Sequence, residues 1–278
     1  MLVVKTVEEL KNVLFRVHSA GKSVGFVPTM GALHEGHLAL LQQARSENEA
    51  VVCSIFVNPM QFNNDADLQK YPRTLEADLT LLQGLVDVVF APSKQEVFPE
   101  PPTEKYDFGQ LETVMEGTAR PGHFNGVAII VKRLFEWINP EKAYFGEKDF
   151  QQLVIVKKMA KQYKLQTEIV SCPIVREESG LAFSSRNKRL SDSELNLAAN
   201  INRILRGSSI IGNPSVEAIK SFVTNELDKY PALKLDYFEI VNAQTLQPVE
   251  TLKSAKHIVG CIAVYVGEVR LIDNIRYK

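Results

Sequence analysis

Two histidines bracketed by glycines are the residues whose type and spacing most suggest chemistry. His34 and His37 lie three positions apart in the run VGFVPTMGALHEGH, residues 24–37. Gly31 precedes the pair and Gly36 lies between them. The spacing places both imidazoles on one side of the first turn of a helix, whose amide groups and positive dipole end attract phosphate. Because glycine lets the backbone approach such a ligand closely, the run predicts a phosphate-binding site.

Two simpler interpretations account for parts of this pattern. A glycine-containing turn from a strand into a helix is common in α/β proteins, and a single histidine near it is often a surface or capping residue. A histidine pair can also bind a metal ion, but the metallopeptidase pattern sets its histidines four apart with a glutamate beside the first. The combination of a glycine-bracketed pair with a helix start favours the phosphate interpretation.

The elements that must position this pair are strands and helices in alternation. Apolar, β-branched runs predict buried strands at residues 24–28, 50–57, 86–92, 143–145 and 167–175. Helical spacing of apolar residues predicts helices at residues 7–20, 38–45, 75–85, 125–139 and 150–163. Such alternation predicts a Rossmann-like α/β fold, a doubly wound parallel sheet that binds ligands at the carboxyl ends of its strands.

The alternation of predicted parallel strands and helices ends near Val175. A polar loop follows, and Ser191 with Glu194 forms a capping box that opens a helix. Two helices are then expected, followed by strands around residues 237–241, 257–266 and 269–272. We therefore predict a Rossmann-like domain at residues 1–175 and a smaller C-terminal α+β domain at residues 176–278.

Composition narrows the class of protein further. The chain has 278 residues, of which 45% are hydrophobic, and 32 basic against 33 acidic side chains give a net charge of -1. No overall field would draw it onto nucleic acid or an anionic membrane. The start lacks the features of a signal peptide, no apolar run approaches membrane-spanning length, and Cys53, Cys172 and Cys261 are widely spaced. We predict a cytoplasmic protein with reduced, buried thiols and no nucleic-acid or membrane partner.

Three further groups of polar residues follow predicted strands. Gln61 offers both donors and an acceptor to a small substrate, and Lys148 and Gln152 lie at a predicted helix start. In the run FSSRN, the hydroxyls of Ser184 and Ser185 and the guanidinium of Arg186 suit phosphates. Taken alone, Gln61 and Lys148 are more readily explained as residues exposed to solvent.

The run PTMGALHEGH resembles the His-x-Gly-His signature of the nucleotidyltransferase superfamily, which includes the class I aminoacyl-tRNA synthetases. In its full form it resembles the pantothenate synthetase (pantoate-β-alanine ligase) family. Three further runs resemble that family in the same order: FVNPMQF with DLQKYPRT, GEKDFQQ, and FSSRN as the counterpart of the synthetases' flexible loop. Phe183 departs from the methionine that the family usually has. The run ARPGHFNGV is also similar, and we interpret its His123 as structural.

The resemblance implies an ATP-dependent, AMP-forming ligase that condenses pantoate with β-alanine through a pantoyl adenylate. It implies catalytic roles for His34, His37, Lys148 and Arg186. It implies ATP contacts from Met30, Gly31, His34, Gly36, His37, Gly146, Lys148, Asp149, Val175, Ser184, Ser185 and Arg186. Gln61 would bind pantoate and β-alanine, Gln152 would bind pantoate, and Asp78 would lie near an ATP-bound Mg²⁺. The resemblance also implies a homodimer, and we expect the C-terminal domain to act as a lid over the phosphates.

Two other classes remain open at this stage. Another nucleotidyltransferase would share the histidine run, but it gives no account of Gln61 and Gln152 together. A non-catalytic or RNA-binding relative of the synthetases should have a basic surface domain, which the balanced charge does not favour.

Overall fold

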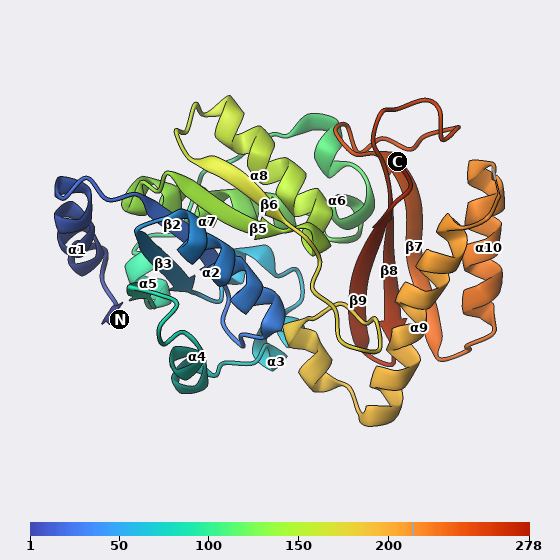
Figure 1. Ribbon diagram of the computed structural model, residues 1–278, viewed down its shortest axis with the longest axis horizontal. Coiled ribbons are helices and arrows are strands. Elements are labelled where there is room, and N and C mark those ends of the chain that lie inside the picture. The colour runs from blue at the N-terminus through green and yellow to red at the C-terminus, as the bar shows by residue number, and fades with distance from the viewer. Residues whose placement is uncertain (213) are drawn as a thin grey trace. The chain divides into compact units, whose positions relative to one another are not determined.

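The computed structural model describes residues 1–212 and 214–278 (Figure 1). The chain divides into two compact units. The first comprises Met1–Phe108, Arg120–Glu147 and Ile155–Pro173, and the second comprises Gly109–Ala119, Lys148–Val154 and Ile174–Lys278. Two segments before residue 175 thus belong to the second unit, which a single boundary at that position does not anticipate.

A parallel sheet forms the centre of the first unit, with six strands in the described residues. Its strand order is β1-β4-β3-β2-β5-β6. The strands are β1 (Leu2–Val4), β2 (Val24–Thr29), β3 (Ala50–Ile55), β4 (Val88–Phe90), β5 (Lys142–Gly146) and β6 (Glu168–Cys172). β2 and β3 are buried along nearly their whole length, as expected for strands covered on both faces. The predicted parallel α/β sheet is confirmed.

The order of the strands places a topological switch point between β2 and β5. The chain runs from β2 to β3 and β4 on one side and then returns to β5, which pairs with β2 on the other side. Ligands of open α/β sheets bind outside the carboxyl ends of the strands at such a point. The segments that leave β3, β2, β5 and β6 all start at this edge, and they carry the predicted site residues.

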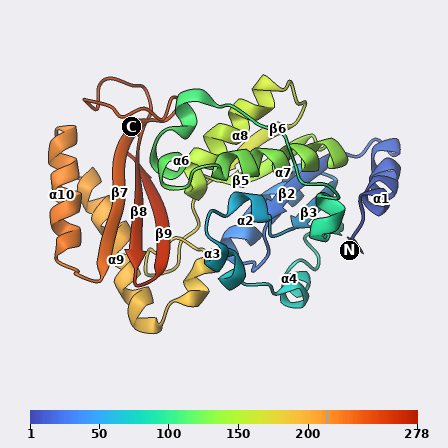
Figure 2. The ribbon, with the colours of Figure 1, turned by 180° about the vertical axis from the view of Figure 1, so that it is seen from behind.

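Helices cover both faces of this sheet. Those of the first unit are α1 (Val7–Ser19), α2 (Glu35–Glu47), α3 (Asp65–Lys70), α4 (Leu75–Leu81), α5 (Lys94–Val97) and α7 (His123–Ile138). α2 lies in front of the sheet in Figure 1, and α7 lies in front of it when seen from behind in Figure 2. α8 (Phe150–Gln162) contributes residues to both units. The predicted doubly wound arrangement is therefore present.

The second unit is an α+β structure. Antiparallel strands β7 (Leu233–Asn242), β8 (Ile258–Val266) and β9 (Val269–Arg276) form its sheet in that order. Gly267 makes the tight turn between β8 and β9 with φ +57°. Helices α9 (Asp192–Ser209) and α10 (Val216–Asp228) pack their apolar sides in one core with the sheet. The capping box of Ser191 and Glu194 starts α9 as predicted.

Several short elements were not predicted from the sequence. They are β1, α3, α5 and α6 (Met115–Ala119), together with the 3-10 helices η1 (Pro59–Gln61), η2 (Gly109–Glu112), η3 (Glu147–Asp149) and η4 (Ser185–Arg189). Each spans six residues or fewer, which is too short for a period of apolar residues to be recognised. Among the described residues, no helix is both long and apolar enough to cross a membrane.

Candidate active site

The segment after β2 folds into a tight loop that leads into α2. Gly31 and Ala32 both have left-handed backbones, with φ +79° and +50°. The hydroxyl of Thr29 donates to the Ser54 carbonyl at 2.7 Å and accepts from the amide of Gly31 at 3.2 Å. Ala32 and Leu33 are buried, so the loop is anchored in the core immediately before His34.

Asp78 holds this loop from α4. Its carboxylate accepts hydrogen bonds from the amides of Ala32 at 2.9 Å and Leu33 at 2.8 Å, and Thr74 donates to it at 3.3 Å. The residue is only 1% exposed. Its contacts therefore give Asp78 the role of fixing the backbone beneath the histidines.

The metal role that the family resemblance implied for Asp78 does not fit this geometry. Both carboxylate oxygens already accept from backbone amides, and an ion would have to reach a buried group. Mg²⁺ prefers near-ideal octahedral oxygen ligands and usually retains several waters, whereas Asp78 offers a single buried carboxylate that already anchors the loop. Among residues 1–212 and 214–278, no group of three or more His, Cys, Asp or Glu side chains could hold a metal.

The two histidines lie together at the start of α2. His34 is the N-cap residue, and its Nδ1 accepts from the amide of Gly36 at 3.2 Å. A ring nitrogen that accepts carries no proton, so the neutral ring of His34 has its proton on Nε2 and can donate from there. The rings of His34 and His37 are 4.1 Å apart between centroids. The structure thus joins two imidazoles to a helix N-terminus, as their spacing predicted.

Gln61 lies in the short η1 helix that follows β3. Its side-chain amide donates to Met30 Sδ at 2.9 Å, and its oxygen accepts from Asn58 Nδ2 at 3.1 Å. Asn58 is buried and also donates to the Gly126 carbonyl at 2.9 Å. Met30, predicted to contact ATP, and Gln61, predicted to contact the other substrates, are therefore in direct contact. Sequence reasoning missed Asn58, although an Asn before Pro is a recognisable capping signal.

Lys148, Asp149 and Gln152 belong to the second unit. The ammonium group of Lys148 is 3.9 Å from the Asp149 carboxylate, and the Lys148 carbonyl accepts from Asn274 Nδ2 at 3.1 Å. Gln152 is half-buried, whereas its neighbour Gln151 is buried, with its amide bonded to the carbonyls of two residues before α6. Of the two adjacent glutamines, Gln152 is thus the one with surface left for a ligand.

The Ser184–Arg186 segment forms the start of η4, also in the second unit. Ser184 caps it by accepting from the amide of Arg186 at 3.2 Å, and Ser185 is buried. The amide of Phe183 donates to the Val175 carbonyl at 3.1 Å. The position where Phe replaces the family's usual Met is therefore tied to Val175, another predicted ATP contact.

The predicted residues divide between the two units. Met30, Gly31, His34, Gly36, His37, Gln61, Asp78 and Gly146 lie in the first, and Lys148, Asp149, Gln152, Val175, Ser184, Ser185 and Arg186 lie in the second. Only Glu147 separates Gly146 from Lys148 in the chain, so the two groups are linked where β5 ends. A Cβ atom placed on Gly146 would meet no described neighbouring atom within 4 Å, which leaves room for a ligand there.

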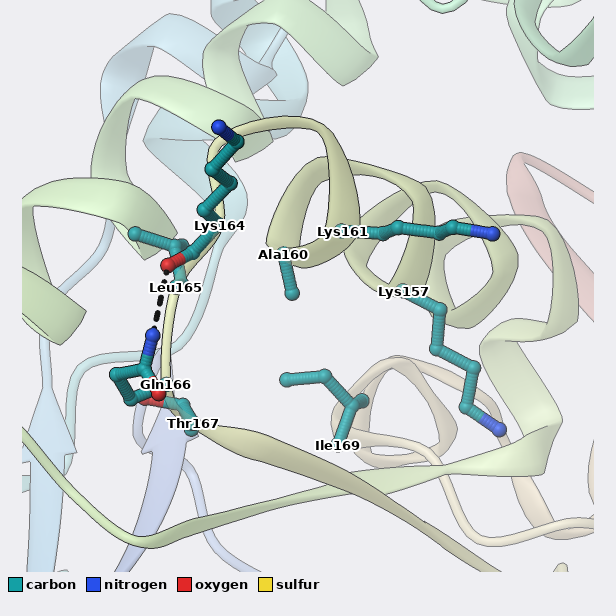
Figure 3. A pocket seen from close by; sticks show the side chains of 8 residues that line it. All are labelled: Lys157, Ala160, Lys161, Lys164, Leu165, Gln166, Thr167 and Ile169. Atoms are coloured by element: carbon teal, nitrogen blue, oxygen red, sulfur yellow. Dashed lines mark hydrogen bonds between the residues drawn. The ribbon is translucent and has the colours of Figure 1, made fainter.

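A hollow of about 350 Å³ lies elsewhere on the first unit (Figure 3). The described residues that line it are Lys157, Ala160, Lys161, Lys164, Leu165, Gln166, Thr167 and Ile169, and none of the predicted site residues is among them. Figure 3 shows the ammonium group of Lys164 pointing away from those of Lys157 and Lys161. Lys161 lies in the last turn of α8, where a cation offsets the negative end of the helix, and Lys157 donates to the Ser171 hydroxyl at 2.5 Å.

The parallel sheet, its switch point and the histidine pair at a helix start are features of the class of α/β proteins whose ligands bind at the carboxyl edge of the sheet. The sequence pattern of the family described as Pantoate-beta-alanine ligase matches residues 2–276. The chain belongs to the pantoate-β-alanine ligase family, whose members are ATP-dependent ligases.

Individual relatives agree with this assignment. The pantothenate synthetase of Phocaeicola vulgatus is 52% identical over 281 residues, with both chains fully covered. The crystal structure of pantothenate synthetase from Thermus thermophilus matches with a TM-score of 0.94 at 43% identity, covering 100% of this chain and 99% of that one. A pantoate-β-alanine ligase from Francisella tularensis, complexed with β-γ ATP and β-alanine, matches with a TM-score of 0.84 at 35% identity, covering 100% and 98%.

Proposed function

We propose that this chain joins pantoate to β-alanine in two steps that convert ATP to AMP and pyrophosphate. The observation that carries the proposal is the histidine pair at the N-terminus of α2, which follows β2 in a segment whose Met30 also contacts Gln61. It combines donors for a phosphate with an amide suited to a small polar acid. Membership of the ligase family and the ligands of the Francisella relative support it.

In the first step, a carboxylate oxygen of pantoate attacks the α-phosphate of ATP. A new P–O bond forms, the bond to the β-phosphate oxygen breaks, and pyrophosphate leaves. Negative charge grows on the α-phosphate oxygens, where the Nε2–H of His34, the ring of His37 and the amides of α2 would donate hydrogen bonds. No covalent bond to the enzyme is required.

The remaining predicted contacts would hold the rest of the nucleotide. Lys148 and Arg186 supply positive charge, and the hydroxyls of Ser184 and Ser185 suit the β- and γ-phosphates. Met30, Gly31, Gly36, Gly146, Asp149 and Val175 complete the proposed ATP contacts.

In the second step, the neutral amine of β-alanine attacks the acyl carbon of the pantoyl adenylate. The C–N bond forms, the bond from the acyl carbon to the phosphate oxygen breaks, AMP leaves, and the amine nitrogen loses one proton. Gln61 would orient pantoate and β-alanine, and Gln152 would bind pantoate. Holding the reacting groups in this geometry would contribute to the rate enhancement, together with the hydrogen bonds to the phosphate.

Mg²⁺ belongs to this proposal as an ion that ATP brings on its phosphates, because the described side chains do not form a cage for it. Asp78 is not proposed as a ligand. Its observed hydrogen bonds instead hold the loop that carries the histidines.

The remaining expectations concern the state of the protein. We propose a cytoplasmic homodimer, for which sedimentation equilibrium is the test of oligomeric state. We also propose that residues 1–175 hold ATP and pantoate and that residues 176–278 act as a lid. Equal hydrogen exchange of residues 177–188 with and without ATP would contradict the lid.

One assay tests the reaction itself. Exchange of labelled pyrophosphate into ATP should require pantoate but not β-alanine, because the adenylate forms before the amine reacts. Release of AMP with formation of pantothenate should require both. Exchange without pantoate, or AMP formed only by hydrolysis of ATP, would overturn the proposal.

A further inference from the structure

The main-chain carbonyl of Gln61 is held by two side chains from residues 120–123. His123 Nδ1 lies 2.7 Å from this oxygen, and Arg120 Nη2 donates to it at 3.0 Å. Arg120 Nη1 is also 3.4 Å from His123 Nε2. All three residues belong to the first unit, and His123 is 7% exposed. The run ARPGHFNGV, which the proposed chemistry leaves without a role, thus converges on a proposed substrate residue.

The directions of these hydrogen bonds are consistent with one another. A carbonyl oxygen can only accept, so His123 must donate to it from a protonated Nδ1. The neutral ring then has an unprotonated Nε2, which accepts from the Arg120 guanidinium. Arg120, His123 and the Gln61 carbonyl therefore form a closed triangle. The tautomer is opposite to that of His34, whose Nδ1 accepts.

Gln61 is consequently restrained at both its main chain and its side chain. Asn58 and Met30 hold its amide group, while Arg120 and His123 hold its carbonyl. The neighbouring backbone has little freedom as well, because a Cβ atom on Gly126 would lie 2.1 Å from the carbonyl oxygen of Met60. Side chains in such sites bind well when their orientation is set before the ligand arrives.

We propose that Arg120 and His123 are positioning residues, which set the orientation of Gln61 for pantoate and β-alanine without touching either. The inference rests on the proposed function of Gln61. A purely structural role at the start of α7 gives no account of the contacts, because both side chains reach across about 60 positions of the chain to one carbonyl. It also assigns a role to His123 that the sequence interpretation, which treated it as structural, did not.

The first test measures KM for each substrate separately. In His123→Ala we expect KM for pantoate and for β-alanine to rise about tenfold, the effect of one lost hydrogen bond on binding geometry, with KM for ATP within about twofold of wild type. Arg120→Ala should act in the same direction, and it provides a second variant if His123→Ala does not fold. Wild-type KM for pantoate in a folded variant of either kind, or an equal rise for all substrates, would overturn the inference.

Two conservative variants distinguish the loss of the hydrogen bond to the Gln61 carbonyl from the loss of side-chain volume at position 123. Asn places an amide N–H near the position of the histidine Nδ1, whereas Gln places one near that of Nε2. We therefore expect His123→Asn to restore most of the affinity for pantoate and His123→Gln to restore little. The reverse order would overturn the proposed contact with the Gln61 carbonyl.

Asn125→Ala is the matched control. Asn125 lies two residues further along α7, where its side chain accepts from the amide of Tyr106 at 2.8 Å and donates to the Glu104 carbonyl at 3.3 Å. The Asn125→Ala substitution therefore removes side-chain hydrogen bonds of the same helix that lead to Glu104 and Tyr106 rather than to Gln61. KM for pantoate should stay at the wild-type value, and a rise equal to that of His123→Ala would overturn the inference.

A double-mutant cycle with Gln61→Ala completes the test. If His123 acts through Gln61, His123→Ala should change KM for pantoate by less than about twofold when Gln61 is already replaced. An undiminished effect in that background would overturn the positioning role alone. Wild-type KM for pantoate in Gln61→Ala itself would instead remove the proposed substrate contact, and the positioning role with it.

Discussion

A buried carboxylate fixes the backbone beneath the histidine pair. The Asp78 carboxylate accepts hydrogen bonds from the amides of Ala32 and Leu33. Ala32 has a left-handed backbone conformation, which a non-glycine residue rarely adopts. Such a conformation persists only where its surroundings enforce it. The position of His34 at the helix start therefore depends on a side chain more than 40 residues further along the chain.

Replacing Asp78 by Asn should reveal this dependence. The amide nitrogen cannot accept, so one loop amide loses its partner, and we expect unfolding to become easier by about 1–3 kcal/mol. Adenylate formation should slow as the histidines lose their orientation. Urea unfolding and single-turnover kinetics are the measurements. Unchanged stability combined with a shifted Mg²⁺ requirement would restore a metal role for Asp78.

His37 is the residue whose loss should separate catalysis from binding. Its imidazole lies beside that of His34 in the first turn of α2, where the proposed reaction would place the phosphate on which charge grows in the transition state. We expect His37→Ala to slow pantoyl-adenylate formation by roughly 10²-fold or more, with a smaller change in ATP affinity.

The exposed His257 provides the control for this variant, because His257→Ala removes an imidazole outside the proposed site. It should leave single-turnover rates unchanged. If His37→Ala forms the adenylate at a near-wild-type rate and still melts cooperatively, His37 has only a structural role at the helix start.

Single residues were predictable where their signal is local. The spacing of His34 and His37 indicated a shared helix face, and the structure brings the rings together. The loop amides that bind Asp78 and the side chains that bind the Gln61 carbonyl were not predictable, since each lies 45 or more positions away from its partner in sequence. Such contacts depend on which loops the sheet topology brings to one edge.

At the scale of elements, β9 holds two segments that carry predicted nucleotide contacts. Asn274 donates to the Lys148 carbonyl, and its neighbour Asp273 makes a two-bond ion pair with Arg176 at 2.7 and 2.9 Å. Asp273 is 5% exposed. All four residues lie in the second unit. The strand thereby fixes Lys148 and the start of the polar loop that leads to Ser184.

Asn274→Ala should therefore weaken the binding of ATP rather than the binding of pantoate. Loss of the contact frees the Lys148 backbone, and we expect KM for ATP to rise about threefold to tenfold while KM for pantoate stays within about twofold. Asn200→Ala is the control, because Asn200 donates to the carbonyl of Leu197 within its own helix. An equal change for both substrates, or none in a folded variant, would contradict this role of β9.

Helices were predictable where a capping signal is followed by apolar residues at helical spacing. Ser191 with Glu194 forms the capping box that the sequence predicted for α9, and Thr6 with Glu9 forms another at the start of α1. The short α6 was missed because its stabilising contact is tertiary: the amide of Glu116 donates to the buried Gln151 side chain at 3.0 Å. A single-sequence pattern contains no sign of such a partner.

Across the whole molecule, buried thiols and phenols should make stability sensitive to alkali. Burial raises the pKa of Cys53 and Cys261 to about 12 and that of Cys172 to about 11, and it raises the pKa of Tyr277 to about 12. The pKa of Tyr237 is raised by burial and by the nearby Glu116 carboxylate.

These groups keep their protons in the folded state at pH values where the unfolded chain loses them. Their contribution to stability is complete below the unfolded-state pKa values, about 8.5 for thiols and about 10 for phenols, and is lost as pH rises toward the folded-state values. We expect the urea midpoint, measured in reductant, to fall steadily from about pH 8.5 to 11. A constant midpoint over this range would contradict the raised pKa values.

A cluster around Arg270 connects residues 109–119 to the antiparallel sheet of the second unit. Its guanidinium donates to both oxygens of Glu116 at 2.9 and 2.7 Å and to Asp236 at 2.8 Å. The hydroxyl of Tyr237 donates to Glu116 at 2.9 Å, and the guanidinium lies over the Tyr237 ring at 5.7 Å. The side chains of Glu116 and Arg270 are only 9% and 17% exposed. The cluster thus attaches α6 to β7 and β9 through nearly buried charges.

Replacing Arg270 alone should therefore lower the free energy of unfolding far more than replacing Arg270 and Glu116 together. In Arg270→Met the Glu116 carboxylate stays buried without its cation, and we expect a loss of about 3–5 kcal/mol in unfolding free energy. Replacing Glu116 by Met as well should recover much of that loss, because a buried ion pair contributes little net stability over apolar packing. Urea unfolding of the single and double variants measures both effects.

Hydrogen exchange shows whether the cluster holds the segment or only stabilises the sheet. Arg203→Met is the control, since its guanidinium lies over the Tyr230 ring at 5.8 Å, nearly the distance in the cluster, but the residue is exposed. We expect exchange of residues 109–119 to quicken in Arg270→Met and to stay unchanged in Arg203→Met. If Arg270→Met destabilises the protein while residues 109–119 exchange as in wild type, the segment is held by its apolar contacts, among which Met115 packs with Val241 and Val259. The charged cluster would then act on the antiparallel sheet alone.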